Sequence, residues 1–463
     1  MTSAVAGHAT DETLVRAAAP AGGDRLRPWE KISYGLGDFA CGLSWNAVGA
    51  FLLYFYTNVA LLPAAAVGTL FLLSRLFDAG VDLGVGLMVD RTRSRWGRTR
   101  PYFLFTAVPF SILLVLTFTT IDASTGAKLA YAYITFSLLG ILYSFLAVPF
   151  SALMPMMTTD HGSRMQLGSA RAIGTSISVI LATAATMPLV GLLGGGNERT
   201  GFALVAVLFA ALTLAALLNL FFSCRERHHD EAPRSEAIGP QLSAMARNRA
   251  WLVTFLFCTL NFLRFGCVIS VTAFFAIEVM KAPWMIGILL PAVSGTLLLS
   301  AFIAPMIFKR TGIRRGCIAA LAAAILLHLI LPWVEAQHML FLSLFLIAAI
   351  LVSLTMTAIF TMAADAVDYH EWIFGVRNEG LLSSGISLST KVGMAVGTAI
   401  IAYVLGIAGY DPKAVTDGAR AAIRWSYYGW PIAIMIIQLI IIAFWPMDGL
   451  HERIRKEIAA RVG

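Results

Sequence analysis

Residues 224–249 read CRERHHDEAPRSEAIGPQLSAMARNR, and they form the longest polar stretch inside the 463-residue chain. On either side, residues 31–223 and 250–445 consist mainly of apolar runs. Many of these runs reach the ~20 residues that a helix needs to cross a bilayer. The polar stretch therefore predicts a linker between two halves of a helical membrane protein.

The composition supports this interpretation. Hydrophobic residues make up 58% of the chain and charged residues only 13%, whereas soluble domains average about 45–50% apolar and about 25% charged residues. A soluble fold of this length could not bury so much apolar surface, so the composition excludes a soluble globular protein. The net charge of +8 lies in short clusters between apolar runs, a pattern typical of membrane topology and not of nucleic-acid binding.

Hydropathy divides the chain into twelve candidate spans, six on each side of the linker. We therefore predict an all-α membrane protein with twelve transmembrane helices in two six-helix bundles. The predicted spans are approximately 33–57, 64–89, 101–120, 128–153, 167–192, 201–223, 250–276, 285–308, 316–332, 339–365, 381–408 and 422–445. The predicted domains are an N-terminal tail (1–30), a first bundle (31–223), the linker (224–249), a second bundle (250–445) and a C-terminal tail (446–463).

The distribution of Lys and Arg predicts the orientation. If the N-terminus is inside, the inner segments hold 24 of the 34 basic residues and the outer segments hold six. Because basic loops remain on the cytoplasmic side, we expect both tails to be cytoplasmic and the protein to lie in the cell membrane. The starts of the first and seventh spans lie close to 218 residues apart, and so do the basic turns that follow the second and eighth spans. Two parallel repeats would show such an offset.

The second span carries charges that a bilayer disfavours, because each ionisable group at mid-membrane costs at least ~2.5–3.5 kcal/mol. Residues 72–82 read LLSRLFDAGVD, and Asp78 and Asp82 lie one turn apart on one helix face. A cation such as Na⁺ between them, or a proton on one of them, would relieve their repulsion. The alternative is a buried Arg75–Asp78 ion pair with Asp82 near water.

Three further charged residues within predicted spans are candidates for the site. Asp38 is interpreted as a hydroxyl-binding or pore-network carboxylate, with an interfacial position as the alternative. Arg171 is interpreted as a charge that neutralises Asp78 and Asp82 or that gates the inner side. The alternative is that its side chain extends to the interface between membrane and water. Lys391 lies too deep to reach water easily, so we expect acids beside it, with Asp78 and Asp82 as the candidates.

An acidic stripe at the inner end of the tenth span faces a basic turn in our interpretation. Asp365, Asp368 and Glu371 are three residues apart, and the turn 91–100 is rich in Arg. We predict a salt-bridge lock between the bundles, with a solvated charged loop as the alternative. The predicted lock residues are Arg91, Arg95, Asp365, Asp368, Glu371 and Arg377.

Hydroxyl, amide and aromatic side chains in several spans suit a sugar, whose hydroxyls need partners and whose CH face stacks on rings. The alternative is that these small polar residues only join helices. The candidate substrate residues are Asp38, Trp45, Asn46, Tyr143, Ser151, Ser387 and Lys391.

Several motifs occur in an order that resembles a known family, the glycoside–pentoside–hexuronide:cation symporters, which include melibiose and glucuronide permeases. The resemblance spans about residues 31–450 and implies a major facilitator fold that couples sugar uptake to Na⁺, Li⁺ or H⁺. The motifs are YGLGD at 34–38, RxxDxxxD at 75–82, TRSRWGR at 92–98, ADAVDY at 364–369 and KVG at 391–393.

The resemblance also implies roles for individual residues. The family's cation-site aspartates fall on Asp78 and Asp82, and a hydroxyl at the same site falls on Ser144. The lysine between cation and sugar sites falls on Lys391, and an arginine falls on Arg171; with Arg75, these two would balance and couple charge.

This chain departs from the melibiose permeases where those carriers grip galactose. It has Gly42 and Ala147 where they have aspartates, and Ser151 where they have tryptophan. The cation half of the site therefore carries over better than the sugar half.

We expect a secondary active symporter, with no enzyme activity and no cofactor beyond the co-transported cation (Na⁺ or H⁺, with Li⁺ as a third option). The expected substrate is a sugar or glycoside, the expected surroundings are membrane lipid, and a monomer is the expected working unit. The alternative within carriers is a non-sugar amphiphile or export. An enzyme would need a positioned nucleophile, metal or acid–base set, and we find no such motif.

Overall fold

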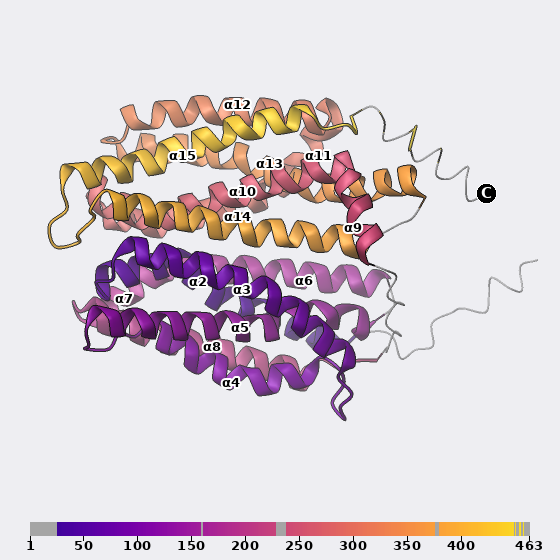
Figure 1. Cartoon of the computed structure of the whole chain (residues 1–463), viewed down its shortest axis with the longest axis horizontal. Coiled ribbons are helices and arrows are strands. Elements are labelled where there is room, and N and C mark those ends of the chain that lie inside the picture. The colour runs from indigo at the N-terminus through magenta and orange to yellow at the C-terminus, as the bar shows by residue number, and fades with distance from the viewer. Residues whose placement is uncertain are drawn as a thin grey trace, which may run out of the picture.

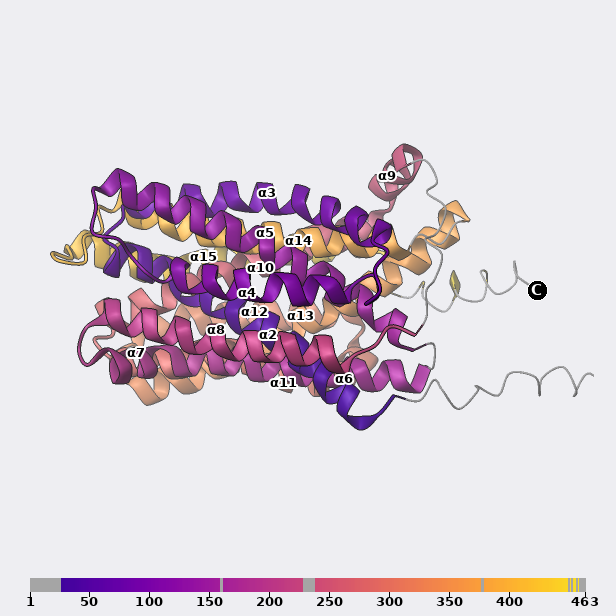
Figure 2. The same ribbon diagram turned by 90° about the horizontal axis from the view of Figure 1, so that it is seen from below.

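The computed structural model describes residues 26–158, 161–227, 238–375, 379–448 and 450, together with 453, 454 and 457. Figures 1 and 2 show long helices lying side by side along one axis, and this described part of the chain contains no strand. The predicted all-α class is confirmed. The predicted tails and the linker fall partly outside these residues.

The helices coincide with the predicted spans to within a few residues at most ends. Before the linker they are α2 (Pro28–Tyr54), η1 (Phe55–Val59), α3 (Ala64–Arg91), α4 (Arg100–Thr117), α5 (Thr125–Met157), α6 (His161–Ile180), η2 (Leu181–Ala185), α7 (Thr186–Gly194) and α8 (Glu198–Ser223). A short helix, α9 (Ile238–Arg247), lies inside the predicted linker. After it come α10 (Arg249–Phe274), η3 (Phe275–Val279), η4 (Pro283–Met285), α11 (Ile286–Thr311), α12 (Ile313–Ile330), η5 (Leu331–Trp333), α13 (His338–Phe374), α14 (Glu379–Ile407) and α15 (Asp417–Ala443).

Ten described helices are long and apolar enough to cross a membrane, and α11 adds an eleventh if its two segments, bent by 50°, count as one span. The other predicted span is α3, which has 28 residues. Its first part, Ala64–Ser74, is apolar, and its second part carries Asp78 and Asp82. The protein is therefore a multi-pass membrane protein whose most charged long helix holds the acid pair.

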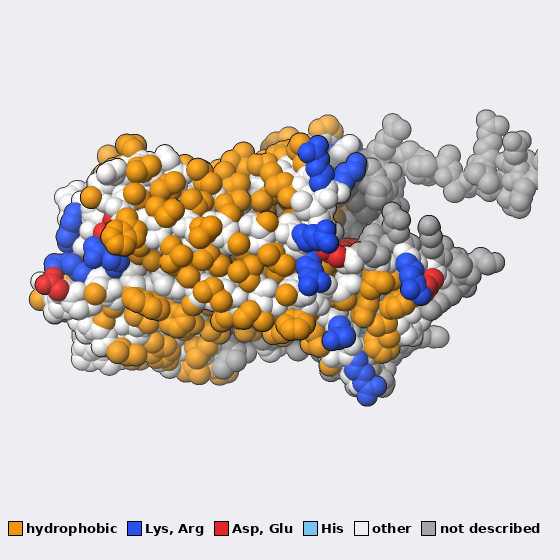
Figure 3. Space-filling view, turned by 90° about the horizontal axis from the view of Figure 1, so that it is seen from above, with side chains coloured by type: hydrophobic (Ala, Val, Ile, Leu, Met, Phe, Trp, Pro, Cys, Tyr) orange, Lys and Arg blue, Asp and Glu red, His pale blue; other side chains and the backbone are white. Residues whose placement is uncertain are grey.

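The helices form two groups in space. Figure 1 shows α2 to α8 in its lower half and α10 to α15 in its upper half. We call the end that carries the turn 92–99, helix α9 and the α11–α12 turn the basic end, and the other end the opposite end. Figure 3 shows apolar side chains covering the middle of one face, with Lys and Arg side chains gathered towards both ends.

The two halves share an unusual local feature. The first helix of each half ends in a π-helical turn, Phe55–Val59 in one half and Phe275–Val279 in the other. Two residues after each turn, Leu61 and Lys281 adopt positive φ angles of 59° and 53°, which is uncommon for residues other than glycine. The 220-residue offset agrees with the internal symmetry expected from the sequence.

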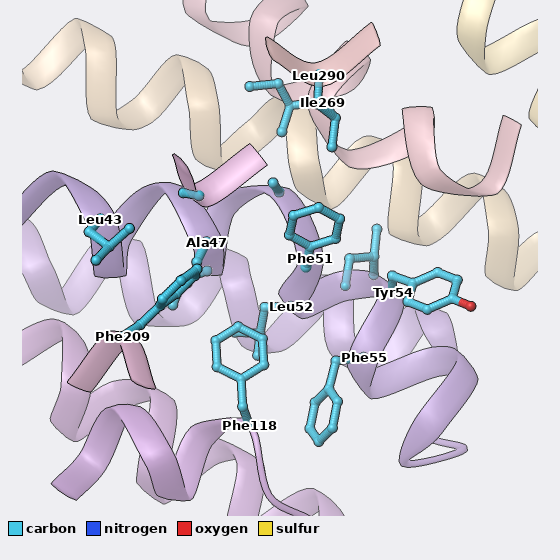
Figure 4. Close-up of a cluster of buried hydrophobic side chains, with 14 of the residues drawn as sticks. Leu43, Ala47, Phe51, Leu52, Tyr54, Phe55, Phe118, Phe209, Ile269 and Leu290 are labelled. Atoms are coloured by element: carbon cyan, nitrogen blue, oxygen red, sulfur yellow. The ribbon is translucent and has the colours of Figure 1, made fainter. Parts of the chain in front are cut away.

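At the opposite end the halves are in close contact. Figure 4 shows Ile269 of α10 and Leu290 of α11 pointing towards Phe51 of α2, and all three belong to one buried cluster. Further along, the Tyr54 and Phe274 rings lie 5.7 Å apart. Burial of these apolar groups stabilises the contact between the halves.

Polar contacts between the halves lie at the same end. The Asn58 amide donates to the Tyr410 hydroxyl at 3.0 Å, and the Thr69 and Tyr403 hydroxyls are 2.8 Å apart. Each pair joins a residue of the first half to one of the second. Burial and hydrogen bonding together close the opposite end.

Towards the basic end, the face of α14 that packs against α3 becomes partly exposed. Residues spaced by three and four along one face of α14 show this directly. Ala402, Ala399 and Ala395 are at most 4% exposed, whereas Val392 and Leu388 are 41% and 42% exposed. The same face of α14 is thus covered at the opposite end and uncovered at the basic end.

Candidate functional site

Asp78 of α3 is buried against α5. The carboxylate lies so close to Gly140 that a Cβ built on this glycine would be 2.6 Å from Oδ1 of Asp78. Ser144, four residues after Gly140 and therefore on the same face of α5, is also buried. The absence of a side chain at Gly140 lets the Asp78 carboxylate reach the α5 backbone beside this serine.

Asp82, one turn further along α3, is bound from the other half of the molecule. The Lys391 ammonium of α14 donates to Oδ2 of Asp82. The other carboxylate oxygen, Oδ1, is buried and has no hydrogen-bond partner among the described residues. Because an unsatisfied carboxylate oxygen is costly to bury, this atom is available for a cation or a proton.

The chemistry of these groups suits a hard cation or a proton better than a transition metal. Carboxylate and hydroxyl oxygens are ligands for ions such as Na⁺. Among the described residues, no group of three or more His, Cys, Asp and Glu side chains is arranged to hold a metal ion. Arg75, the third charge of this segment, has a side chain that falls outside the described part of the structure.

A second charged cluster joins α2 and α6. The Arg171 guanidinium donates from Nε to Oδ1 of Asp38 at 3.0 Å, and the Thr175 hydroxyl donates to Oδ2 of the same carboxylate. The guanidinium also lies over the Phe150 ring, 5.3 Å from its centre. Arg171 thus pairs with Asp38, a partner that sequence reasoning did not supply.

An aromatic pair lies between α2 and α5. The Trp45 and Tyr143 rings stack with their centres 4.2 Å apart and their planes 14° apart. The amide of the next residue, Asn46, donates to the Gly42 carbonyl of its own helix at 2.7 Å. A Cβ on Gly42 would lie 2.3 Å from the Ser178 hydroxyl oxygen, so this close packing of α2 on α6 leaves no room for a larger side chain without rearrangement.

The remaining substrate candidates and the basic residues of the predicted lock are exposed or lie outside the described residues. Ser151 and Ser387 are both exposed. Arg91 and Arg95 are exposed as well, and the Arg95 guanidinium lies over the Trp96 ring. Arg377 is not among the described residues.

The basic turn is bound by an acid from the start of the predicted linker, just after α8. Glu226 accepts hydrogen bonds from the backbone N–H groups of Arg98, Thr99 and Arg100. Asp365 is buried and lines an open pocket of about 460 Å³, together with Lys309 of α11 and Asp448. The predicted lock between the halves remains a prediction.

Two residues of the site escaped sequence reasoning, although the sequence held a signal for each. Gly140 lies four residues before Ser144, and Thr175 lies four residues after Arg171. Residues four apart share a helix face, so a candidate on a span also implicates small or hydroxyl residues one turn away.

Comparison with known proteins supplies the family. Residues 33–449 match the family described as MFS/sugar transport protein. The isoprimeverose transporter of Lactiplantibacillus pentosus is 33% identical, with 93% of this chain and 91% of the relative covered. The putative glycoside/cation symporter YagG of Escherichia coli is 34% identical, with 82% of this chain and 83% of the relative covered.

Solved structures support the fold. A bacterial homologue of the human lysosomal transporter Spinster, in an inward-facing and unoccupied conformation, superposes with a TM-score of 0.66 and 15% identity, covering 91% of this chain and 97% of that one. This level of identity bears on the fold alone. The match over nearly the whole chain, the relatives above 30% identity and the ordered motifs lead to one conclusion: the chain belongs to the MFS/sugar transport family, as one of its glycoside–pentoside–hexuronide:cation symporters.

Proposed function

We propose that this protein accumulates a glycoside by symport with a monovalent cation, Na⁺ or H⁺, through alternating access. The observation that carries the proposal is the Lys391–Asp82 ion pair between the two halves, beside a buried carboxylate oxygen of Asp82 for which the described residues supply no hydrogen-bond partner. This arrangement ties a cation-binding carboxylate to the relative position of the halves.

In this proposal the cation binds between Asp78 and Asp82, with the Ser144 hydroxyl as a further ligand. A cation beside Asp82 competes with the Lys391 ammonium for the same carboxylate. Binding therefore weakens the ion pair between α3 and α14 and frees the lysine to contact substrate. By linkage, substrate must raise the affinity for the cation by the same factor.

The proposed sugar site lies on the first half, near the Asp38–Arg171 pair. Asp38 and Arg171 offer hydrogen-bonding groups to sugar hydroxyls, and Trp45 and Tyr143 offer a stacked aromatic surface. A glycoside is favoured as substrate because the similar proteins are named for isoprimeverose transport and for glycoside/cation symport.

We further propose that the protein lies in the inner membrane of the cell and that its basic end faces the cytoplasm. The exposure of Leu388 and Val392 of α14 towards that end is consistent with an inward-facing state. In the outward-facing state the basic end would close, and the acidic stripe of α13, including Asp368 and Glu371, would meet Arg91 and Arg95.

Reconstituted vesicles test the proposal. We expect a labelled glycoside to drive Na⁺ or H⁺ across the membrane, and we expect an imposed cation gradient to concentrate that glycoside. The measurement uses a panel of glycosides with and without Na⁺ at two pH values. Downhill sugar flux that neither moves a cation nor responds to a cation gradient would rule out symport.

A substitution at Gly140 tests the cation site without changing a charge. In the Gly140→Ala variant, the new Cβ would overlap Oδ1 of Asp78 at 2.6 Å, so the carboxylate must move. Overpacking of this kind costs about 1–3 kcal/mol, which corresponds to a loss of about 5- to 140-fold in apparent cation affinity.

Gly126→Ala on the same helix is the matched control, since a Cβ there meets nothing within 4 Å. Cation affinity is read from the concentration that gives half-maximal glycoside uptake. Equal affinities in the two variants would show that Asp78 does not bind the cation.

A further inference from the structure

The second half holds a buried positive charge that takes no part in the proposed cation and sugar sites. Arg264 lies near the middle of α10 and is only 7% exposed. Its guanidinium donates from Nη2 to the amide oxygen of Asn261 at 3.3 Å, and its Nε–H is buried without a hydrogen-bond partner among the described residues. A charge buried within a membrane-spanning helix needs a counter-charge, because without one it is strongly destabilising.

The side chains around Arg264 supply no such counter-charge. Asn261, which accepts from Arg264, donates in turn to the Thr355 hydroxyl of α13 at 3.2 Å. His328 of α12 lies near enough for the two charges to interact, but a histidine ring is only ever neutral or positive. Within the described parts of the chain, no Asp or Glu side chain forms an ion pair with Arg264. The positive charge is therefore left uncompensated by the protein itself.

Helix α15 brings a second unsatisfied polar group to the level of Arg264. The Phe275 ring, directly after α10, stacks on the Tyr427 ring of α15 with their centres 3.9 Å apart, which fixes the register of these two antiparallel helices. Arg264 precedes Phe275 by eleven residues, and Gln438 follows Tyr427 by eleven. Because eleven residues make about three helical turns, Arg264 and Gln438 lie at one level on the facing sides of α10 and α15 (Figure 1).

Gln438 cannot be explained as a partner of the guanidinium. Its side chain is fully buried, and both its amide nitrogen and its amide oxygen lack a hydrogen-bond partner among the described residues. Burying an amide in this way is costly. The amide nitrogen offers two N–H donors, and Arg264 uses only one of the five that a guanidinium carries. A group bound here would therefore meet mainly N–H donors beside a positive charge.

These properties favour a small anion over water or an organic molecule. A water molecule can satisfy donors but leaves the charge of Arg264 uncompensated, whereas an anion meets both needs. The burial of Arg264 and Gln438 closes the position to bulk solvent, so a large organic anion has no access to it. A monoatomic anion accepts hydrogen bonds from any direction and suits donors that come from two different helices.

We propose that Arg264 and Gln438 bind a chloride ion between α10 and α15, as a resident part of the second half. Because both helices belong to the same half, which moves as one body in alternating access, the ion stays in place during transport. Chloride is neither the co-transported cation nor the substrate, so the inference goes beyond symport and does not depend on it.

The dependence of the melting temperature on chloride tests the site. The purified full-length protein is heated in detergent in mixtures of choline chloride and choline gluconate, so that ionic strength stays constant and Na⁺ is absent. A ligand that binds only the folded protein stabilises it, so we expect the wild-type melting temperature to rise with chloride and then to saturate. Bromide should replace chloride, whereas sulfate, a larger oxyanion, should not.

Three variants assign the effect to particular residues. Arg264→Gln should lose the chloride effect, and in gluconate it should melt no lower than the wild type, because no charge is left to compensate. Gln438→Leu keeps the charge but removes two donors, so the half-saturating chloride concentration should rise at least about tenfold, the effect of one hydrogen bond to a charged group. Arg424→Gln, an exposed arginine of α15 bound to Glu335, is the control and should keep the wild-type dependence.

Each outcome decides for or against the site. Equal wild-type melting temperatures in chloride and gluconate overturn it, and so does a chloride effect that persists in Arg264→Gln. Lost uptake of methyl β-D-glucuronide in Arg264→Gln, without any chloride effect in the wild type, assigns the guanidinium to a substrate carboxylate and also overturns it. If Arg264→Gln does not fold, equilibrium dialysis of the wild type with radioactive chloride decides. A single bound ion that bromide displaces supports the site, and no bound ion overturns it.

Discussion

Asp82→Asn is expected to abolish uphill accumulation of substrate while substrate exchange across the membrane continues. A membrane potential of 100 mV contributes ~2.3 kcal/mol for each charge that enters with the substrate. At ~1.4 kcal/mol for each factor of ten, coupling to one cation supports an accumulation of about 40- to 50-fold. The variant should instead equilibrate its substrate, with an internal to external ratio of about one. Asp78→Asn should do the same.

Loss of accumulation alone would not separate cation binding from a structural role. Asp82→Asn also deprives the Lys391 ammonium of its Asp82 partner. Breaking a fully buried pair costs about 3–5 kcal/mol, and we expect a smaller cost here because the Lys391 side chain is 36% exposed. The single variant should therefore show a lowered melting temperature as well as lost coupling.

The double variant Asp82→Asn with Lys391→Gln separates the two roles. Removing both charges should restore the melting temperature, because no charge is left without its partner. If Asp82 binds the cation, accumulation should remain absent in the double variant even though the protein is stable. Recovery of accumulation together with stability would mean that Asp82 serves only to hold Lys391.

Sequence reasoning located the spans and the acid pair because both depend on strong local signals. A bilayer requires long apolar runs, so a break in hydropathy marks each helix end, and a charge inside such a run is conspicuous. Asp78 and Asp82 are such charges within the otherwise apolar sequence of α3. The cost of placing these charges is thus visible in the sequence itself.

Which residues of different helices contact one another could not be predicted in the same way. Two acids lie one turn apart on α3, and only the relative position of α3 and α14 places Lys391 on Asp82. The close approach of Asp78 to Gly140 likewise depends on how α3 packs against α5. Pairing of Arg171 with Asp38 depends on the contact of α2 with α6. These contacts join residues far apart in the chain, and hydropathy carries no information about them.

The contacts at the opposite end also follow from packing, and they explain why the halves are in close contact there. Small residues on α3 and α14 let the two backbones approach. A Cβ on Gly68 would lie 2.9 Å from the Cβ of Ala402, and one on Gly406 would lie 2.7 Å from that of Ala65. Near the basic end the corresponding face of α14 presents Leu388 and Val392, which are exposed.

A disulfide between α3 and α14 is expected to stop transport by holding the opposite end closed. In the Gly68→Cys/Ala402→Cys variant the two Cβ atoms start 2.9 Å apart, and a disulfide needs about 3.5–4.5 Å. The helices must therefore part by about 1 Å, while the hydrogen bond between Thr69 and Tyr403 next to them still favours closure. Alternating access requires this end to open, so oxidation should reduce uptake to the level of protein-free vesicles, and a reductant should restore it.

The controls for this variant follow from the cysteines already present. All five native cysteines are buried and free, so the wild type and the two single variants should keep their uptake after the same oxidation. Binding to the closed state should survive, because the cross-link leaves the basic end and the acid pair unchanged; a cation-dependent rise in melting temperature measures this. If the cross-linked protein transported at the rate of its reduced form, the contact of α3 with α14 would not be the barrier at the opposite end. The barrier at the opposite end would then have to lie in the contact of α2 with α10, where Ile269 points towards Phe51.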